Sequence, residues 1–262
     1  MAESVPELID THAHLDDRKL ARRLDDVLAR AREAGVVAVV NIGADLASSR
    51  ASVDLARRRP MVFATVGIHP HDATAADEPT WDALERLAAE PQVVAIGECG
   101  LDFYRDLSPR HVQRQVFARQ LALAEGLDLP VVIHCRDAYE ACLRMVRSER
   151  SGPVRGILHC FQGDGAAARQ ALDLGLHVAV GGSITFPREE ALRRAVAKVP
   201  LERLLVETDC PYLTPRPKRG SNEPAYVRFV AQCLADLHHT PLHRLAATTT
   251  ATARALLELR TQ

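Results

Sequence analysis

Histidine and carboxylate side chains recur in this sequence directly after short runs of apolar residues. Imidazole nitrogens and carboxylate oxygens together suit Zn²⁺, Mn²⁺ or Fe²⁺, and a site rich in carboxylates also accepts Mg²⁺. The residue types therefore predict a centre for divalent metal ions. The side chains concerned are His12, His14, His69, His71, Glu98, His134, His159 and Asp209.

The closely spaced pair His12 and His14 also predicts a local geometry. In an extended strand, side chains two residues apart point to the same side, so both imidazoles can reach one cation. Asp10 has the same parity, and we expect it to orient one of the imidazoles. Taken alone the pair is weak evidence, because two surface histidines in a turn show the same spacing.

Each of the other groups also has a structural alternative when it is considered singly. Glu98 can be an acidic residue at a helix N-terminus, His134 and His159 can be hydrogen-bonded core histidines, and Asp209 can be an N-cap before Pro211. These separate explanations are much harder to sustain when such side chains stand at the ends of five expected strands at once. Buried imidazoles and carboxylates are costly unless they are paired or coordinate a metal.

The number of candidate ligands favours two ions over one. A single catalytic zinc takes three protein ligands and a water, whereas six ligands can serve two ions that share a bridging carboxylate. Glu98 follows a central run of the chain, and we expect it to be the bridge. The expected metal ligands are His12, His14, Glu98, His134, His159 and Asp209.

The elements that position these groups follow from the apolar runs, which are short and rich in β-branched residues. Amphipathic stretches lie between them, such as 109–126. Eight such units in 262 residues predict one α/β domain over 1–262, a (β/α)8 TIM barrel whose strand ends meet at one mouth. A doubly wound open sheet is the alternative, but the first run lacks the glycine-rich turn of that fold. The expected strands are 8–10, 36–41, 61–66, 93–97, 130–134, 155–159, 177–181 and 204–207.

Four cysteines directly follow expected ligands, namely Cys99, Cys135, Cys160 and Cys210. Because side chains alternate along a strand, the residue after an inward-facing ligand points toward the helices. We therefore expect these thiols to fill the layer between strands and helices.

Composition and motifs exclude several other classes of protein. The formal net charge is −1, which argues against binding of duplex nucleic acid by bulk charge. No lysine follows an expected strand, and there is neither a phosphate-binding GxxxxGK loop nor a GxSxG nucleophile turn. Without a targeting segment or a long apolar run, we expect a cytoplasmic enzyme or binding protein with no membrane contact. No obligate protein partner is evident from the sequence.

Seven segments, in order along almost the whole chain, resemble the TatD-type metal-dependent hydrolases, also described as TatD deoxyribonucleases, among the amidohydrolase-like barrels. They are IDTHAHLD (9–16), VGIHPH (66–71), AIGECGLDFYRD (95–106), PVVIHCRDA (130–138), GILHCFQGD (156–164), VETDCPYLTP (206–215) and RGSNEPAYV (219–227). Two departures from the family pattern concern substrate preference: Gln162 stands where a small residue is common, and Ser221 where lysine is common.

The resemblance implies a barrel that binds two divalent ions and hydrolyses phosphodiester bonds with a two-metal activated water. Its substrate would be single-stranded DNA or DNA ends. One ion would be held by His12, His14, Glu98 and Asp209, and the other by Glu98, His134 and His159. Asp209 would also take a proton from the attacking water. His69 would polarise a phosphate oxygen or protonate the leaving group.

We expect basic residues near the mouth to contact the substrate. Besides His69 and His71, the expected contacts are Arg105, Arg136 and Arg219, with Arg216 and Lys218 as further candidates for flanking phosphates. A solvated loop face is the alternative for the arginines. Two other functions use the same ligands: hydrolysis of a carboxylic ester, lactone or amide, such as an aminoacyl ester on RNA, and a non-enzymatic adaptor stabilised by metal.

Overall fold

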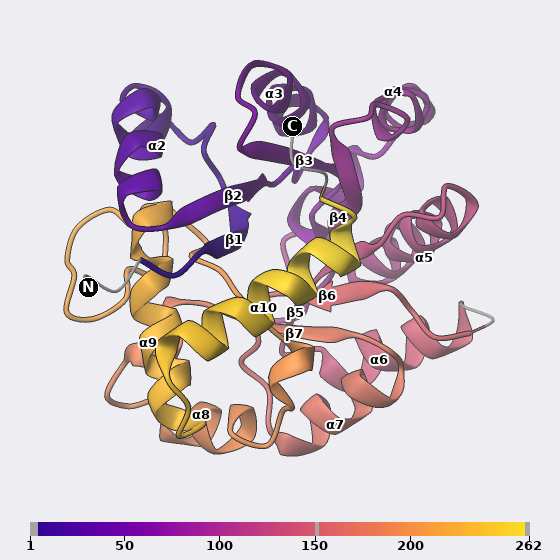
Figure 1. The fold of residues 1–262 in the computed structure, drawn as a ribbon. Helices are drawn as coiled ribbons and strands as arrows, with labels where there is room; N and C mark the ends of the chain where they lie inside the picture. Colours follow the sequence, from indigo (N-terminus) through magenta and orange to yellow (C-terminus); the bar gives the residue numbers. More distant parts are fainter. Residues whose placement is uncertain (1–4, 150–151, 260–262) are drawn as a thin grey trace.

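Eight parallel strands lie in sequence order around a barrel in the computed structural model, which describes residues 5–149 and 152–259 (Figure 1). The barrel closes where Ala13, at the end of the first strand, forms a parallel bridge with Cys210, which follows the last strand. The predicted (β/α)8 barrel is thus confirmed, whereas the single domain over 1–262 stays a prediction. The strands are β1 (Leu8–Ala13), β2 (Val36–Asn41), β3 (Val62–Val66), β4 (Val93–Asp102), β5 (Val131–Arg136), β6 (Gly156–Leu158), β7 (His177–Val180) and β8 (Leu204–Val206).

Helices connect successive strands and surround the barrel. They are α1 (Arg18–Ala21), α2 (Leu24–Glu33), α3 (Leu46–Arg58), α4 (Glu78–Ala88), α5 (Arg110–Gly126), α6 (Tyr139–Ser148), α7 (Gly165–Asp173), α8 (Glu190–Val196), α9 (Val227–Leu237) and α10 (Leu242–Leu257). Short 3-10 helices are η1 (Pro70–Ala75), η2 (Gly182–Thr185), η3 (Leu201–Arg203) and η4 (Pro224–Tyr226). No helix within 5–149 and 152–259 combines the length and apolar character needed to cross a membrane.

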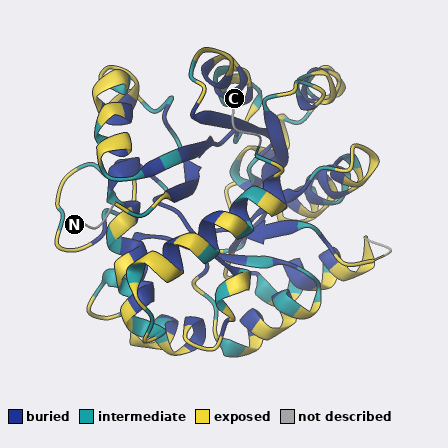
Figure 2. Ribbon diagram, in the orientation of Figure 1, coloured by how far each residue is buried: buried dark blue, intermediate teal, exposed yellow. Residues whose placement is uncertain are grey.

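The apolar core has two parts, and the strands between them are buried while the outer helix faces are exposed (Figure 2). The larger part lies between strands and helices. The smaller part fills the barrel interior with side chains such as Ile9, Val40 and Leu205, and α10 adds Leu256. In Figure 1, α10 crosses the amino-terminal end of the barrel. This end is therefore closed by apolar packing, and the opposite mouth is left for polar groups.

The fourth strand is longer than the sequence indicates, and the difference matters for the site. We expected it to end at Gly97, but β4 continues to Asp102 because Cys99–Asp102 pair with Ile133–Arg136 of β5. Glu98 and Asp102 are therefore both held by strand pairing. Likewise β1 extends to Ala13 and includes His12.

Candidate metal centre

Glu98 lies at the centre of the side chains that converge on the carboxyl-terminal mouth. Its Oε2 atom lies 3.4 Å from His12 Nε2 and 4.0 Å from His14 Nε2. Its Oε1 atom lies 2.9 Å from His134 Nδ1, 3.5 Å from His69 Nε2 and 3.6 Å from His159 Nε2. The two oxygens of one carboxylate thus face two different groups of histidines.

The first group consists of His12, His14 and Asp209 around Glu98 Oε2. Asp209 Oδ1 lies 3.4 Å from His14 Nε2 and 3.8 Å from His12 Nε2. Two ligand atoms on one tetrahedral zinc are separated by about 3.3 Å, so these spacings fit a shared cation. His12 is fully buried, and neither of its ring nitrogens has a hydrogen-bond partner. Buried imidazoles normally have a partner, and a cation shared with Glu98 and Asp209 would give one to His12 Nε2, the nitrogen that faces them.

In the second group, His134 and His159 each have a carboxylate beside the ring nitrogen that does not face Glu98. His134 Nε2 lies 3.1 Å from Asp102 Oδ2, and His159 Nδ1 lies 2.9 Å from Glu207 Oε1. A ring that gives its proton to such a partner keeps a lone pair on the other nitrogen. In both rings that other nitrogen faces Glu98, as a metal ligand would require.

Sequence reasoning missed Asp102 and Glu207 as parts of this site. A signal was present, because Asp102 comes four residues after Glu98 and Glu207 two residues before Asp209. Glu98 and Asp102 both lie on β4, where residues at even spacing share a face, whereas Glu207 and Asp209 follow the end of β8 and are placed by the turn of the chain there.

His69 is held differently from the other histidines. Its Nδ1 accepts a hydrogen bond from the backbone N–H of His71 at 3.1 Å. Burial is the main cause that lowers the pKa of His69, to about 3, so the ring is uncharged at neutral pH. Its single proton therefore sits on Nε2, which faces Glu98 and acts as a donor rather than as a ligand. His71 Nε2 lies 2.9 Å from Asp102 Oδ2.

The charges of the site favour bound cations. Burial alone would lower the pKa of His134 and His159, but their carboxylate neighbours outweigh it and raise the pKa values to about 9 and about 10. Burial would raise the pKa of Glu98, yet the surrounding histidines hold it well below its usual range. The carboxylates thus stay ionised and draw protons onto the imidazoles. Divalent ions replace such protons when they bind, so the donor set fits them.

Asp10 takes another role from the one we expected. Its carboxylate accepts hydrogen bonds from Thr208 N at 2.9 Å, Thr208 Oγ1 at 2.6 Å and the backbone N–H of His12 at 3.3 Å. It therefore joins β1 to the segment after β8 and does not orient an imidazole. These bonds hold His12 and Asp209 in a fixed relation, because both lie within two residues of them.

The expectation for the cysteines is confirmed for three of the four. Cys99, Cys135 and Cys210 are buried in the core between strands and helices. Cys160 is the exception, because the chain turns after β6 and gives this residue a positive φ of 45°. Its half-buried thiol lies beside His159 and Glu207 instead of pointing toward the helices.

The predicted substrate contacts lie on two sides of the mouth. Arg136 ends β5, and its guanidinium lies 3.9 Å from the centre of the Tyr104 ring, while Arg105 is exposed in the neighbouring loop after β4. Arg219 is exposed in the loop after β8. The structure therefore brings Arg105 and Arg136 close to the second group of histidines and places Arg219 on another side.

An eight-stranded parallel barrel with histidines and carboxylates gathered at its carboxyl-terminal mouth defines a metal-dependent hydrolase. A sequence model of the TatD related DNase family matches residues 9–258. The chain belongs to this family.

Individual proteins of known sequence or structure agree. An uncharacterized metal-dependent hydrolase, YabD of Bacillus subtilis, is 38% identical over 253 residues, which cover 96% of this chain and 99% of that protein. The 3′-5′ ssDNA/RNA exonuclease TatD of Salmonella typhimurium is also 38% identical, over 258 residues, with 96% and 99% covered. The crystal structure of YJJV, a TatD homolog from Escherichia coli, superposes with a TM-score of 0.91 at 28% identity and covers 97% of this chain and 99% of its own.

Proposed function

We propose that this protein is an exonuclease that removes nucleotides from single-stranded DNA, using two divalent ions. The observation that carries the proposal is Glu98, whose two oxygens face separate groups of metal-type ligands. Two-metal sites that share a carboxylate are typical of enzymes that cleave phosphate esters. The name of the Salmonella relative supports a single-stranded substrate and attack from the 3′ end.

The residues that would hold the ions are divided by the two oxygens of Glu98. His12, His14 and Asp209 would share one ion with Oε2, and His134 and His159 would share the other with Oε1. When bound, such ions lower the pKa of a water and withdraw negative charge from phosphate oxygens. The ligand set accepts Zn²⁺, Mn²⁺ or Fe²⁺ more readily than Mg²⁺.

Asp209 is suited to accept the proton of the attacking water. Burial would raise its pKa, but the hydrogen bond from His14 and the nearby His159 and His12 outweigh burial and lower it. The carboxylate is therefore ionised and able to take a proton at neutral pH. Its backbone N–H donates to His12 O at 2.9 Å, which fixes it beside the first group.

His69 would stabilise the transition state through a hydrogen bond. Its Nε2–H points toward the oxygens between the two groups, and the backbone of His71 fixes the ring. An uncharged imidazole of low pKa donates a hydrogen bond well but carries no second proton to transfer. Of the two expected roles, the structure therefore supports polarisation of a phosphate oxygen over protonation of the leaving group.

Basic side chains around the mouth would hold the strand. Arg136 and Tyr104 form a stacked pair beside the second group, and Arg105 lies next to them. Guanidinium groups bind phosphate through two parallel hydrogen bonds, and an exposed aromatic ring can stack on a base. We propose His71, Arg105, Arg136 and Arg219 as substrate contacts.

The test measures release of nucleotides from single-stranded DNA labelled at either end, with and without EDTA. We expect EDTA and Glu98→Gln to abolish release, while Glu33→Gln, at an exposed glutamate at the other end of the barrel, leaves it unchanged. Loss of the label from the 3′ end first is the expected polarity. Activity that resists EDTA would overturn the metal mechanism. Hydrolysis of carboxylic esters, lactones or amides without cleavage of DNA would replace the proposed substrate.

A further inference from the structure

A groove lies beside the metal centre, between the loop that follows β7 and the loop that follows β8. Its volume is about 670 Å³, and its lining includes Arg188 from the first loop and Arg216 from the second. The loops are joined at the base of the groove, where Arg216 N donates a hydrogen bond to Thr185 Oγ1 at 2.8 Å. The side chains that line the groove include Phe186, Arg188, Glu189, Arg216, Lys218 and Arg219.

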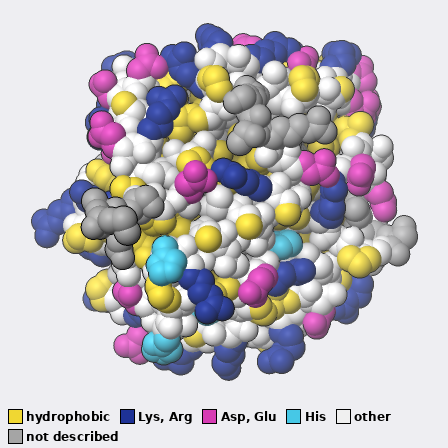
Figure 3. Space-filling model, in the orientation of Figure 1, with side chains coloured by type: hydrophobic (Ala, Val, Ile, Leu, Met, Phe, Trp, Pro, Cys, Tyr) yellow, Lys and Arg dark blue, Asp and Glu magenta, His cyan; other side chains and the backbone are white. Residues whose placement is uncertain are grey.

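The groove carries more positive than negative side chains. Arg188, Arg216 and Arg219 are exposed, and none of them forms an ion pair with a carboxylate of the described residues. Glu189 is the single carboxylate among the lining residues. On the α10 side of the molecule, basic and acidic side chains lie interspersed (Figure 3). Because the whole chain has a net charge of −1, this positive groove is a local feature.

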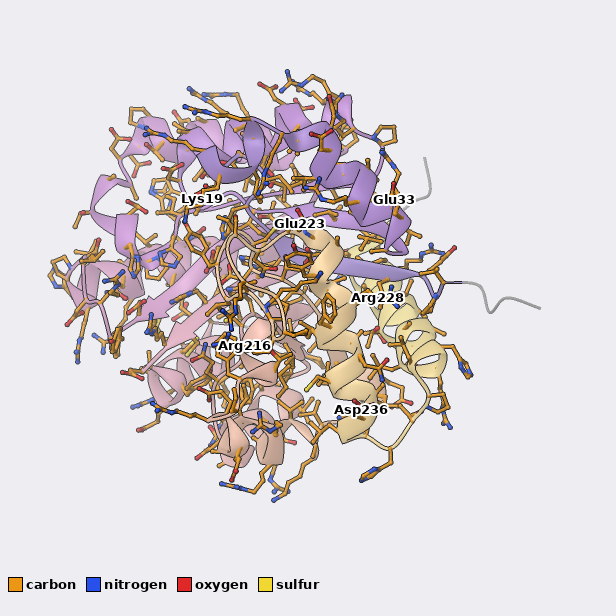
Figure 4. All side chains as sticks on the ribbon, turned by 90° about the vertical axis from the view of Figure 1, so that its left-hand side faces the viewer. Lys19, Glu33, Arg216, Glu223, Arg228 and Asp236 are labelled. Atoms are coloured by element: carbon orange, nitrogen blue, oxygen red, sulfur yellow. The ribbon has the colours of Figure 1, made fainter. Side chains whose placement is uncertain are left out.

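The groove opens at the same end of the barrel as the metal centre. A Cβ atom on Gly182 would overlap Leu213 O, so the two loop backbones are in direct contact just beyond the strand ends. Asn222 Nδ2 holds the second loop down through Thr208 O at 2.8 Å and Tyr212 O at 2.7 Å. In Figure 4, Arg216 lies toward the mouth side together with Lys19, whereas Glu33 and Asp236 lie toward the α10 side.

The groove offers both kinds of contact that a single strand of nucleic acid needs. Guanidinium groups of arginine bind phosphates, and the half-buried ring of Phe186 supplies an aromatic face for a base. Lys218 already forms cation–π contacts, since its ammonium lies 5.2 Å from the centre of the Tyr226 ring and 5.3 Å from that of Phe229. The arginines thus remain as the free anion-binding groups.

We propose that this groove is a second substrate site, which binds the sugar-phosphate backbone of the strand away from the bond that is cut. The proposal rests on the proposed function and adds to it that strand length, and not only the terminal nucleotides, determines affinity. A strand that reaches from the metal centre past η2 meets Arg188 and Arg216, whereas a dinucleotide is confined to the metal centre.

The experiment compares the double variant Arg188→Ala/Arg216→Ala with a matched control, Arg32→Ala/Arg147→Ala. Arg32 and Arg147 are also exposed, but they lie at the carboxyl-terminal ends of α2 and α6, away from the mouth. Each metal-loaded enzyme is assayed on a dinucleotide and on a single strand of about 20 nucleotides, longer than most single-strand binding sites. Thermal denaturation verifies that each variant is folded.

We expect the groove variant to raise KM for the long strand about tenfold at unchanged kcat, because two phosphate contacts are lost. Its activity on the dinucleotide should match the wild type. The slope of log kcat/KM against log salt should become shallower by about 1.4, which is the single-strand value for two phosphates. The variant Arg188→Lys/Arg216→Lys should retain most of the affinity, since it keeps both charges.

A groove variant that behaves like the matched control on the long strand would overturn the second site while leaving the proposed nuclease function intact. An equal loss on both substrates would also overturn it, because the arginines would then act at the metal centre. A wild-type enzyme that cuts neither substrate would refute the proposed function and, with it, this inference.

Discussion

Replacement of His69 by alanine tests whether this histidine is a donor to the substrate or a ligand of the metal. Its Nε2 lies 3.5 Å from Glu98 Oε1, almost the same as the 3.6 Å of His159 Nε2, so distance alone does not separate the two roles. The hydrogen bond from His71 N to His69 Nδ1 separates the two roles, because it places the ring proton on Nε2 and so removes the lone pair that a metal ion needs there.

The expected effect follows from the loss of one preorganised donor. Removal of such a group lowers kcat by about 100- to 1,000-fold, or about 2.7–4 kcal/mol of transition-state stabilisation. We therefore expect His69→Ala to lose this much kcat while its metal content after dialysis equals that of the wild type. His69→Gln should recover part of the rate, since an amide still donates a hydrogen bond.

Two comparisons make the result interpretable. His134→Ala should lose metal, because the Asp102 contact leaves the His134 Nδ1 lone pair facing Glu98. His111→Ala, at an exposed position in α5, should change neither property. The reasoning would be refuted if His69→Ala lost metal as His134→Ala does, or if it kept the wild-type kcat.

Further predictions concern the supporting residues. Glu207→Gln should weaken metal binding by about tenfold in a chelator competition, because the carboxylate that orients His159 is lost. A metal affinity equal to that of the control variant Glu202→Gln would contradict this prediction. Burial and Arg203 lower the pKa of His177 to about 4, from about 6.5 in the unfolded chain. Between these two pH values the unfolded chain binds a proton that the folded protein does not, so the free energy of unfolding falls as pH drops from about 6.5 to about 4. In urea denaturation, the free energy of unfolding of His177→Gln should decrease by roughly 1–3 kcal/mol less over this pH range than that of the wild type. Identical pH profiles of the two proteins would contradict this prediction. Gly182→Ala should lower both the melting temperature and the affinity for long strands, since its Cβ would overlap Leu213 O; a wild-type melting curve would show that the loops can separate.

Much of the metal centre was predictable because its groups follow apolar strands in the sequence. The strand ends of a parallel barrel meet at one mouth, so positions alone bring His12, Glu98 and Asp209 together. The spacing of His12 and His14 likewise fixes their common side. The start and end of α5 also follow the sequence closely, because Pro109 and Gly126 mark its limits.

Other features depended on contacts that no local pattern encodes. β4 continues to Asp102 because β5 pairs with it, and this pairing brings Asp102 to His134. Cys160 departs from strand alternation because the chain turns as soon as β6 ends. Local periodicity describes a strand only while its ladder lasts, and the length of the ladder is set by the neighbouring strand.

The amino-acid sequence by itself determined the barrel, because apolar periodicity is a local property of the chain. The seven motifs in order indicated the family and the residue types that gather at the mouth. Only the tertiary structure decided which oxygen of Glu98 faces which histidines, and which ring nitrogen of each histidine lies beside a carboxylate. It also decided that Arg188 and Arg216 line the same groove. These relations depend on rotamers and loop contacts between segments far apart in the sequence, and they are fixed only when the strands close and the side chains pack.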